Sequence, residues 1–157
     1  DLGTPPHPYA FFKNLLHEFP EHTKIVGVQH KGTTIAGLFL LSFRETTISG
    51  WAASDKAYQK LNPNNLLYWE VIKQGCEEGY NYFDFGRSIY DSGTFRFKKP
   101  WGAEPEQLCY QYYLCNMKDI PDTSQLNPKR QRFAKVWSKL PISIASILGS
   151  KIRGGFP

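Results

Sequence analysis

The sequence has few cysteines and no metal-ligand spacing. Its three cysteines, Cys76, Cys109 and Cys115, are odd in number, so we expect reduced thiols in the cytosol that pack in the core. The four histidines lie early in the chain and apart from one another, and they predict neither a zinc site nor a catalytic triad. A glycine-rich phosphate loop of Walker or dinucleotide type is also missing. We therefore expect any chemistry in this chain to rest on cations and hydrogen bonds, with little help from a nucleophile or a metal.

Long apolar runs are missing as well. No run reaches the roughly 18 residues that a membrane span requires, and no secretory leader is visible. With 157 residues, 41% of them hydrophobic and 15% aromatic, the chain has the size and composition of one folded domain with a short appendage. Because it begins at Asp1, we expect it to be a piece of something longer.

Acidic residues are scarce at the end of the chain. Residues 116–157 carry eight Lys or Arg and only Asp119 and Asp122, a net charge of +6. Residues 1–115 carry 11 basic and 12 acidic side chains, a net charge of −1, and the two parts sum to the overall +5. This distribution favours an anionic surface that meets the tail over a nucleic-acid groove that runs through the fold.

Hydrophobic periodicity predicts an α/β (α+β) fold, a mixed sheet with helices on it. An apolar run at 35–41 predicts a strand buried on both faces. Because a helix links residues 80–85 to the earlier strands, we expect that strand to be parallel to a neighbour. The predicted elements are a helix at 7–19, an antiparallel meander at 24–30, 34–43 and 46–53, a helix at 63–78, a strand at 80–85, a short helix at 94–99 and a strand at 107–115.

Residues 62–79 carry helix-boundary signals. Asn62 is the predicted N-cap and Pro63 occupies the first helical position. Gly79 is the predicted left-handed stop. Gly75, inside the helix, predicts close packing against a strand.

The pattern changes after residue 127. The next residues predict a basic amphipathic helix that ends at Pro141, followed by a second apolar stretch at 142–152. The apolar face is expected to pack on protein or to enter lipid, which leaves the basic face free to touch lipid or tRNA. The apolar positions are Phe133, Val136, Trp137 and Leu140, and the basic ones are Lys129, Arg130, Arg132, Lys135 and Lys139.

Two segments are candidates for chemistry. Asp84 and Arg87 follow an aromatic strand, at the sheet edge where α/β proteins bind ligands, and a simple ion pair is the alternative. Residues 93–102 interleave cations with aromatics. Aromatic faces suit a base, a sugar or a lipid-linked pyrophosphate, and the cations suit phosphate. The alternative there is a short helix with core aromatics and solvated cations. The cations are Arg96, Lys98 and Lys99, and the aromatics are Phe95, Phe97 and Trp101.

The order of elements resembles the GNAT acyltransferase fold. The segments Asn65–Ile72, Gly79–Ser88 with its Asp-Phe-Gly-Arg-Ser run, and Phe97–Gly102 with its Phe-Lys-x-x-Trp-Gly run are similar to the FemAB-like branch. That branch includes peptidoglycan-bridge peptidyltransferases and relatives encoded with exopolysaccharide systems. The resemblance implies a GNAT-like domain at 1–115, the C-terminal one of a tandem pair whose N-terminal partner is missing here, and a basic helical tail at 116–157.

The resemblance also implies site residues. Lys98 matches a lysine near the donor's reacting carbonyl, with Phe97 beside it, and Arg87, Arg96, Lys99 and Trp101 are candidate substrate-binding residues. Asp84, Tyr90 or the substrate itself would take the proton from the attacking amine. Ordinary GNAT enzymes bind the coenzyme A pyrophosphate with a glycine-containing loop, and the corresponding residues 53–62 contain no glycine.

From these features we expect a transferase without a permanently bound cofactor. It would move an acyl or aminoacyl group from aminoacyl-tRNA or acyl-CoA onto an amine of a lipid-linked cell-envelope precursor or polysaccharide. Its location would be cytoplasmic, with residues 129–153 touching the anionic inner face of the membrane. The alternatives are a coenzyme-A-dependent N-acetyltransferase, a non-catalytic scaffold and, least favoured, a nucleic-acid-binding module.

Overall fold

The computed structural model of the chain describes residues 7–113, 115, 127–140, 144, 145, 148, 149 and 152. The chain divides into two compact units. Leu15–Glu106 forms one unit, and the other joins Asp1–Asn14 to Gln107–Pro157. The domain boundary that we expect at residue 115 stays a prediction.

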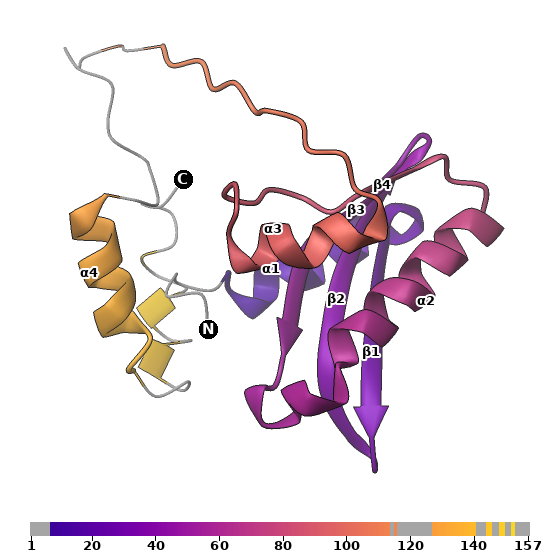
Figure 1. The fold of residues 1–157 in the computed structure, drawn as a ribbon, viewed down its shortest axis with the longest axis horizontal. Coiled ribbons are helices and arrows are strands. Elements are labelled where there is room, and N and C mark those ends of the chain that lie inside the picture. Colours follow the sequence, from indigo (N-terminus) through magenta and orange to yellow (C-terminus); the bar gives the residue numbers. More distant parts are fainter. Residues whose placement is uncertain are drawn as a thin grey trace. The chain divides into compact units, whose positions relative to one another are not determined.

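A four-stranded mixed sheet forms the centre of the first unit (Figure 1). Strands β1 (Thr23–His30), β2 (Thr33–Phe43) and β3 (Thr46–Ser54) form an antiparallel meander. Strand β4 (Tyr82–Asp84) pairs with β3 in the parallel direction. The predicted α/β class, the meander and the parallel strand are confirmed.

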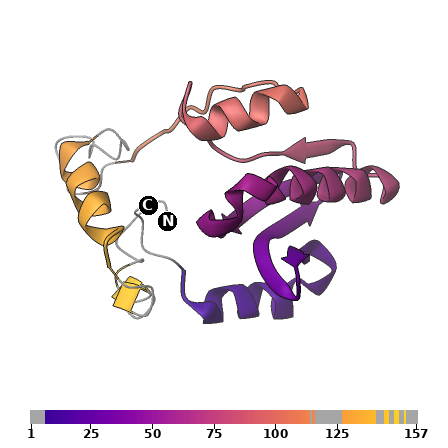
Figure 2. The ribbon, with the colours of Figure 1, turned by 60° about the horizontal axis from the view of Figure 1, so that its bottom comes forward.

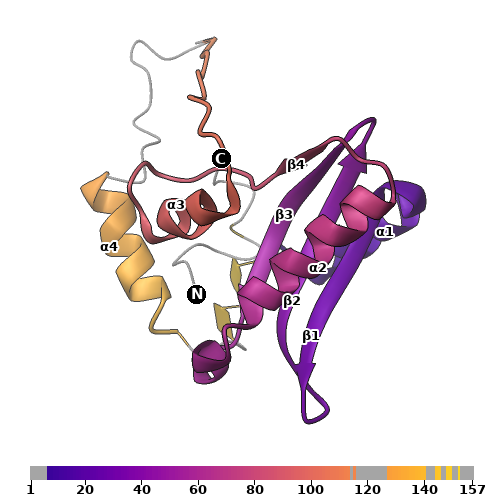
Figure 3. The ribbon, with the colours of Figure 1, turned by 45° about the vertical axis from the view of Figure 1, so that its right-hand side comes forward.

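Helix α2 (Pro63–Glu77) lies across one face of this sheet (Figures 1 and 3). Strand β2 is buried on both faces, as predicted for a central strand. Leu38 packs on the α2 side, against a cluster that includes Leu67 and Val71, all three fully buried. On the other face, Phe39 contacts Trp51 edge to face, with ring centroids 5.7 Å apart. Successive residues of β2 therefore pack on opposite faces of the sheet and contribute to the apolar contacts on both.

Both boundaries of α2 agree with the prediction in position, and only the N-terminal boundary differs in mechanism. Gly79 has a φ of +85° and ends the helix as a left-handed residue. Asn62 also adopts the left-handed conformation, with φ of 50°, and its side chain makes no capping hydrogen bond. The predicted close packing at Gly75 is wrong, because a Cβ built there would meet nothing within 4 Å. The residue instead lines a small cavity.

The remaining elements are short. Helix α1 half-buries its apolar residues from Phe11 to Leu16 and exposes Lys13 and Asn14 between them. Figure 2 shows how β4 leads through a loop to α3. These elements are α1 (Tyr9–Glu18), η1 (Pro20–His22), η2 (Lys56–Leu61), α3 (Gly93–Lys98), η3 (Lys99–Trp101) and α4 (Pro128–Trp137).

Two further expectations are wrong. Cys76, Cys109 and Cys115 are free thiols, as expected, but all three are exposed, so the prediction of core packing is wrong. Residues 107–113 and 115 form no strand. They alternate in polarity, yet every one of them is exposed and no described strand pairs with them, so no ladder of hydrogen bonds holds them extended.

The tail is described in part. Helix α4 confirms a helix after residue 127, whereas most of the predicted apolar stretch at 142–152 lies outside the described residues. Among the helices that the structure describes, none is long and apolar enough to span a membrane.

Candidate functional site

The candidate site lies where β4 ends and the chain turns towards α3. The pairing between β3 and β4 stops at Ile48 and Asp84. There the Asp84 Oδ1 accepts a hydrogen bond of 2.7 Å from the Gly86 N–H. Gly86 has a φ of +70°, and a Cβ on it would lie 3.3 Å from the Ser49 carbonyl oxygen. The backbone therefore leaves β4, beside β3, at a point that suits glycine because of both the left-handed conformation and the limited space.

Lys98 ties helix α3 back to this loop. Its Nζ donates hydrogen bonds to the carbonyl oxygens of Gly86, at 2.8 Å, and Arg87, at 3.1 Å. Burial lowers the pKa of the half-buried Lys98 below its ordinary 10.5, and the nearby charge of Asp84 acts in the opposite direction. Two of the predicted catalytic residues, Lys98 and Asp84, thus lie close to each other. Both also hold the loop in shape.

An aromatic cluster supports the loop and α3. Tyr68 lies at its centre, in ring contact with four other aromatic side chains, of which Phe97 has its ring centroid 5.2 Å away. The Tyr68 hydroxyl and the Ser49 hydroxyl form a buried hydrogen bond of 2.9 Å. The cluster consists of Tyr68, Phe83, Phe85, Phe97 and Trp101. Phe97 and Trp101, both predicted to bind substrate, here pack against the hydrophobic core.

The outer side of α3 carries a different set of contacts. Arg96 donates two hydrogen bonds to the carboxylate of Asp91, at 3.1 and 3.0 Å. The hydrogen bond to Asp91 raises the pKa of Arg96, and burial opposes it weakly. Tyr90 is 79% exposed and lies 4.9 Å from the Phe95 ring.

The predicted site residues are therefore not all brought together. In the described part of the chain, no hydrogen bond or ion pair joins Tyr90, Arg96 or Lys99 to Lys98. Lys99 is exposed in η3, and Arg87 is exposed in the loop with its carbonyl held by Lys98.

The turn between β3 and α2 contains no glycine, and its geometry gives this a physical meaning. Asp55 precedes η2, and its Oδ1 accepts a hydrogen bond of 2.9 Å from the Ala57 N–H. A carboxylate already accepts a hydrogen bond from one amide at the start of this turn, so a second anion there would meet like charge.

A small cavity lies away from these residues. It is about 20 Å³ in volume, lies between α2 and the sheet, and includes Lys24, Ser42, Gly75 and Glu78 in its lining. Such a volume accommodates a group the size of one water molecule. Among the described residues, no three His, Cys, Asp or Glu side chains gather as a metal site would require.

The family follows from comparison with known proteins. The model of the acetyltransferase (GNAT) domain family matches residues 1–99, more than half of the chain. The chain belongs to this GNAT family. A comparison with curated proteins gave no match.

Solved structures share this GNAT fold at low sequence identity. AAC(6')-Iy, an aminoglycoside N-acetyltransferase solved with a bisubstrate analogue of coenzyme A and acetylneamine, has a TM-score of 0.59 and 13% identity over 71% of this chain and 84% of its own. The aminoglycoside acetyltransferase meta-AAC0020 from an uncultured soil metagenomic sample, solved with sisomicin, has a TM-score of 0.56 and 14% identity over 68% of this chain and 74% of its own. At these identities the likeness establishes the fold.

Sequence reasoning missed three residues that shape the site. Ser49 and Tyr68 support the loop through the aromatic cluster, and the Asp55 carboxylate accepts a hydrogen bond from an amide of the β3–α2 turn. Tyr68 follows Leu67 and precedes Val71 at helical spacing, so its burial could have been predicted. The partner of its hydroxyl comes from a strand 19 residues earlier, a pairing that no local pattern indicates.

Proposed function

We propose that the chain is a domain of an N-acyltransferase, which moves an acyl or aminoacyl group onto an amine. Membership of the GNAT family carries this proposal, since the family match covers the sheet, α2, β4 and α3. The carboxyl end of the parallel β3–β4 pair supports it further, because ligands of α/β proteins bind at such ends.

The step that we propose is addition and elimination at an activated carbonyl. The amine nitrogen forms a bond to the carbonyl carbon, the carbonyl oxygen becomes an oxyanion, and the bond to the donor's oxygen or sulfur then breaks. The amine loses one proton and the leaving group gains one. Asp84, Tyr90 or the substrate itself would take the first proton.

Lys98 is the residue that we propose at the oxyanion. An ammonium group has three N–H donors, and two of them hold the carbonyls of Gly86 and Arg87. The third can donate to a developing oxyanion without any rearrangement of the loop. One donor placed in this way is worth about 3 kcal/mol of transition-state stabilisation.

The first candidate donor is an aminoacyl ester such as aminoacyl-tRNA. The specific observation in its favour is the glycine-free β3–α2 turn, where the Asp55 carboxylate already accepts a hydrogen bond from the Ala57 amide. The second candidate is an acyl-CoA thioester. AAC(6')-Iy, which shares the fold, has been solved in complex with coenzyme A, and this favours the thioester.

The acceptor that we propose is an amine on a cell-envelope precursor or polysaccharide, as the FemAB-like resemblance implies. A second GNAT-like domain, N-terminal to this one, would then complete the substrate cleft. The proposal agrees with a site that is a loop and a helix rather than an enclosed pocket.

Calorimetric titration separates the two donors. Saturable binding of alanyl-tRNA, with acetyl-CoA binding weaker than about 1 mM, is expected for the first candidate. Micromolar binding of acetyl-CoA alone would favour the second. In that case Asp55→Asn should tighten acetyl-CoA binding about fivefold, because it removes a like charge from the turn. Turnover of neither donor by the full-length protein would contradict the acyltransferase and leave the scaffold.

A further inference from the structure

Helix α4 and the turn after it carry a stripe of exposed cations. Arg132 and Lys135, three residues apart, lie on one side of α4, and Lys139 follows four residues later in the turn that ends the helix. All three are exposed. Among the described residues, no ion pair involves any of them. We name these three residues the basic stripe.

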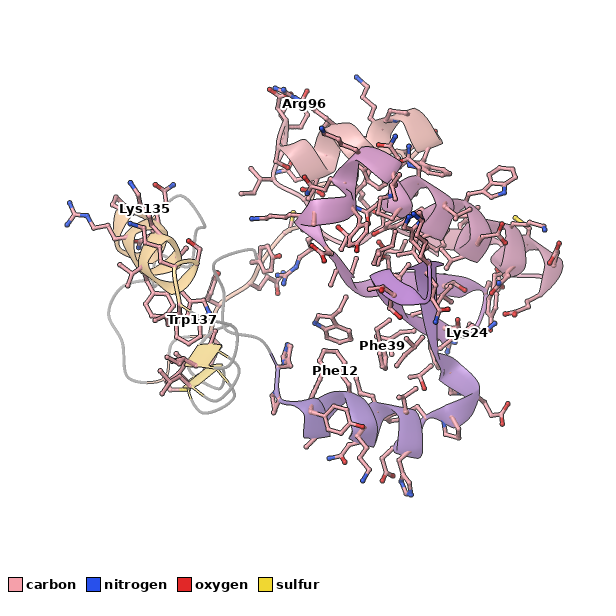
Figure 4. All side chains as sticks on the ribbon, turned by 90° about the horizontal axis from the view of Figure 1, so that it is seen from below. Phe12, Lys24, Phe39, Arg96, Lys135 and Trp137 are labelled. Carbon is pink, nitrogen blue, oxygen red and sulfur yellow. The ribbon has the colours of Figure 1, made fainter. Side chains whose placement is uncertain are left out.

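An exposed aliphatic side chain borders the basic stripe. Val136 is 67% exposed and lies three or four residues from both Arg132 and Lys139. Trp137, by contrast, is 8% exposed and stacks on Phe133 with ring centroids 5.4 Å apart. Figure 4 shows Lys135 and Trp137 on different sides of α4. The exposed side of α4 thus joins cations to an aliphatic group, and the aromatic pair faces elsewhere.

The surrounding sequence cannot neutralise this charge. The last acidic residue is Asp122, and residues 123–157 contain seven Lys or Arg and no Asp or Glu. Leu15–Glu106, which forms the other unit, contains ten Lys or Arg and 11 Asp or Glu. Positive charge is therefore concentrated on one segment, which favours contact with an anionic surface.

We propose that the basic stripe docks on an anionic phospholipid surface, with Val136 entering the boundary between headgroups and acyl chains. Clustered Lys and Arg attract acidic lipids, and an aliphatic neighbour adds burial that phosphate contacts alone do not give. Single-stranded nucleic acid is less well matched, because its bases stack on exposed aromatic rings. In α4 the tryptophan is buried and already stacked. The docking does not depend on which donor or acceptor the domain uses.

Vesicle co-sedimentation of the full chain tests this proposal. We expect binding to phosphatidylcholine vesicles that contain phosphatidylglycerol, little binding to phosphatidylcholine alone, and loss of binding at high salt. Each cation at such a surface is worth about fivefold in partitioning. The triple variant Arg132→Glu, Lys135→Glu, Lys139→Glu should therefore lose at least about a hundredfold, and Val136→Ser about fivefold.

A matched control carries the same change in net charge elsewhere. Lys13→Glu, Lys31→Glu and Lys60→Glu alter three exposed lysines outside the basic stripe, and this variant should bind within about threefold of the unchanged chain. Equal loss in both triple variants, equal binding to neutral vesicles, or vesicle binding by the basic-stripe variant within about threefold of the unchanged chain would overturn the proposal. Circular dichroism of each variant shows that the fold is retained, and donor titration reports separately on the acyltransferase.

Discussion

The inner side of helix α3 faces the aromatic cluster around Tyr68, and the outer side faces away from it. Similar residues have different surroundings on the two sides. On the inner side, Lys98 is half-buried, bonds two backbone carbonyls and has a lowered pKa. On the outer side, Arg96 lies two residues earlier, is exposed, pairs with Asp91 and has a raised pKa (Figure 4). The two cations of this short motif therefore make different contacts with the loop: Lys98 binds backbone carbonyls, and Arg96 binds an exposed carboxylate.

The aromatic residues of the same segment divide in the same way. Phe97 joins the cluster around Tyr68, whereas Phe95 contacts the exposed ring of Tyr90. The inner side thus joins the hydrophobic core to the loop through consecutive residues, Phe97 and Lys98. Changes to Phe97 or Lys98 should therefore lower both the stability and the rate of acyl transfer, and changes to Phe95 or Arg96 should lower the stability less.

The largest expected effect is on the inner aromatic. Phe97→Ala removes a ring from the cluster and leaves a cavity beside Tyr68, so we expect the free energy of unfolding to fall by about 3 kcal/mol. Phe95→Ala is the matched change on the outer side, with an expected loss of about 1 kcal/mol. Urea unfolding of both variants measures the difference. Equal losses would contradict the claim that the inner side of α3 contributes more to the free energy of unfolding than the outer side.

A smaller effect is expected at the start of the loop. Gly86→Ala places a Cβ on a left-handed residue, 3.3 Å from the Ser49 carbonyl oxygen, and should cost about 1–2 kcal/mol. Gly75→Ala is the control, because its Cβ meets nothing and it sits within a helix. That variant should gain about 0.5–1 kcal/mol. Thermal unfolding of the pair distinguishes the two glycines, and a stabilised Gly86→Ala would refute the geometry of the loop.

The smallest effect concerns the protonation of Lys98. Burial lowers its pKa below 10.5 and Asp84 opposes the shift, so Asp84→Asn should lower this pKa further. NMR titration of the Lys98 side-chain carbons measures both values. With a pKa lower in the folded state, the folded chain binds fewer protons here than the unfolded chain at alkaline pH. Wild type should therefore gain stability relative to Lys98→Met as pH rises from the folded pKa towards 10.5, and a relative loss would contradict the burial.

Much of the fold could be predicted because local patterns and topology agree. The double-faced apolar run of β2, the left-handed stop at Gly79 and the helix between β3 and β4 each left a signal in the sequence. The expected strand at 107–115 failed because alternation alone does not supply a partner strand. The predictions of close packing at Gly75 and at the cysteines were wrong because a sequence shows that a residue is small or apolar without showing what surrounds it.

The candidate site was less predictable. The sequence of residues 93–102 shows that cations and aromatics are interleaved. Which of these side chains face the core depends on the geometry of α3. That Lys98 reaches back 11 and 12 residues to backbone carbonyls depends on the loop conformation that Gly86 permits. Such contacts need coordinates, since carbonyl acceptors carry no side-chain signature in a sequence.

The central claim is that Lys98, fixed by the carbonyls of Gly86 and Arg87, donates its remaining N–H to the oxyanion of the acyl transfer. Hydroxylamine is a small amine acceptor, and hydroxamate formation from the bound donor reports the rate in the full-length protein. Lys98→Met should lower this rate about a hundredfold or more, while the donor's dissociation constant stays within about threefold. A rate for Lys98→Met within twofold of wild type, with the donor bound as before, would contradict the claim.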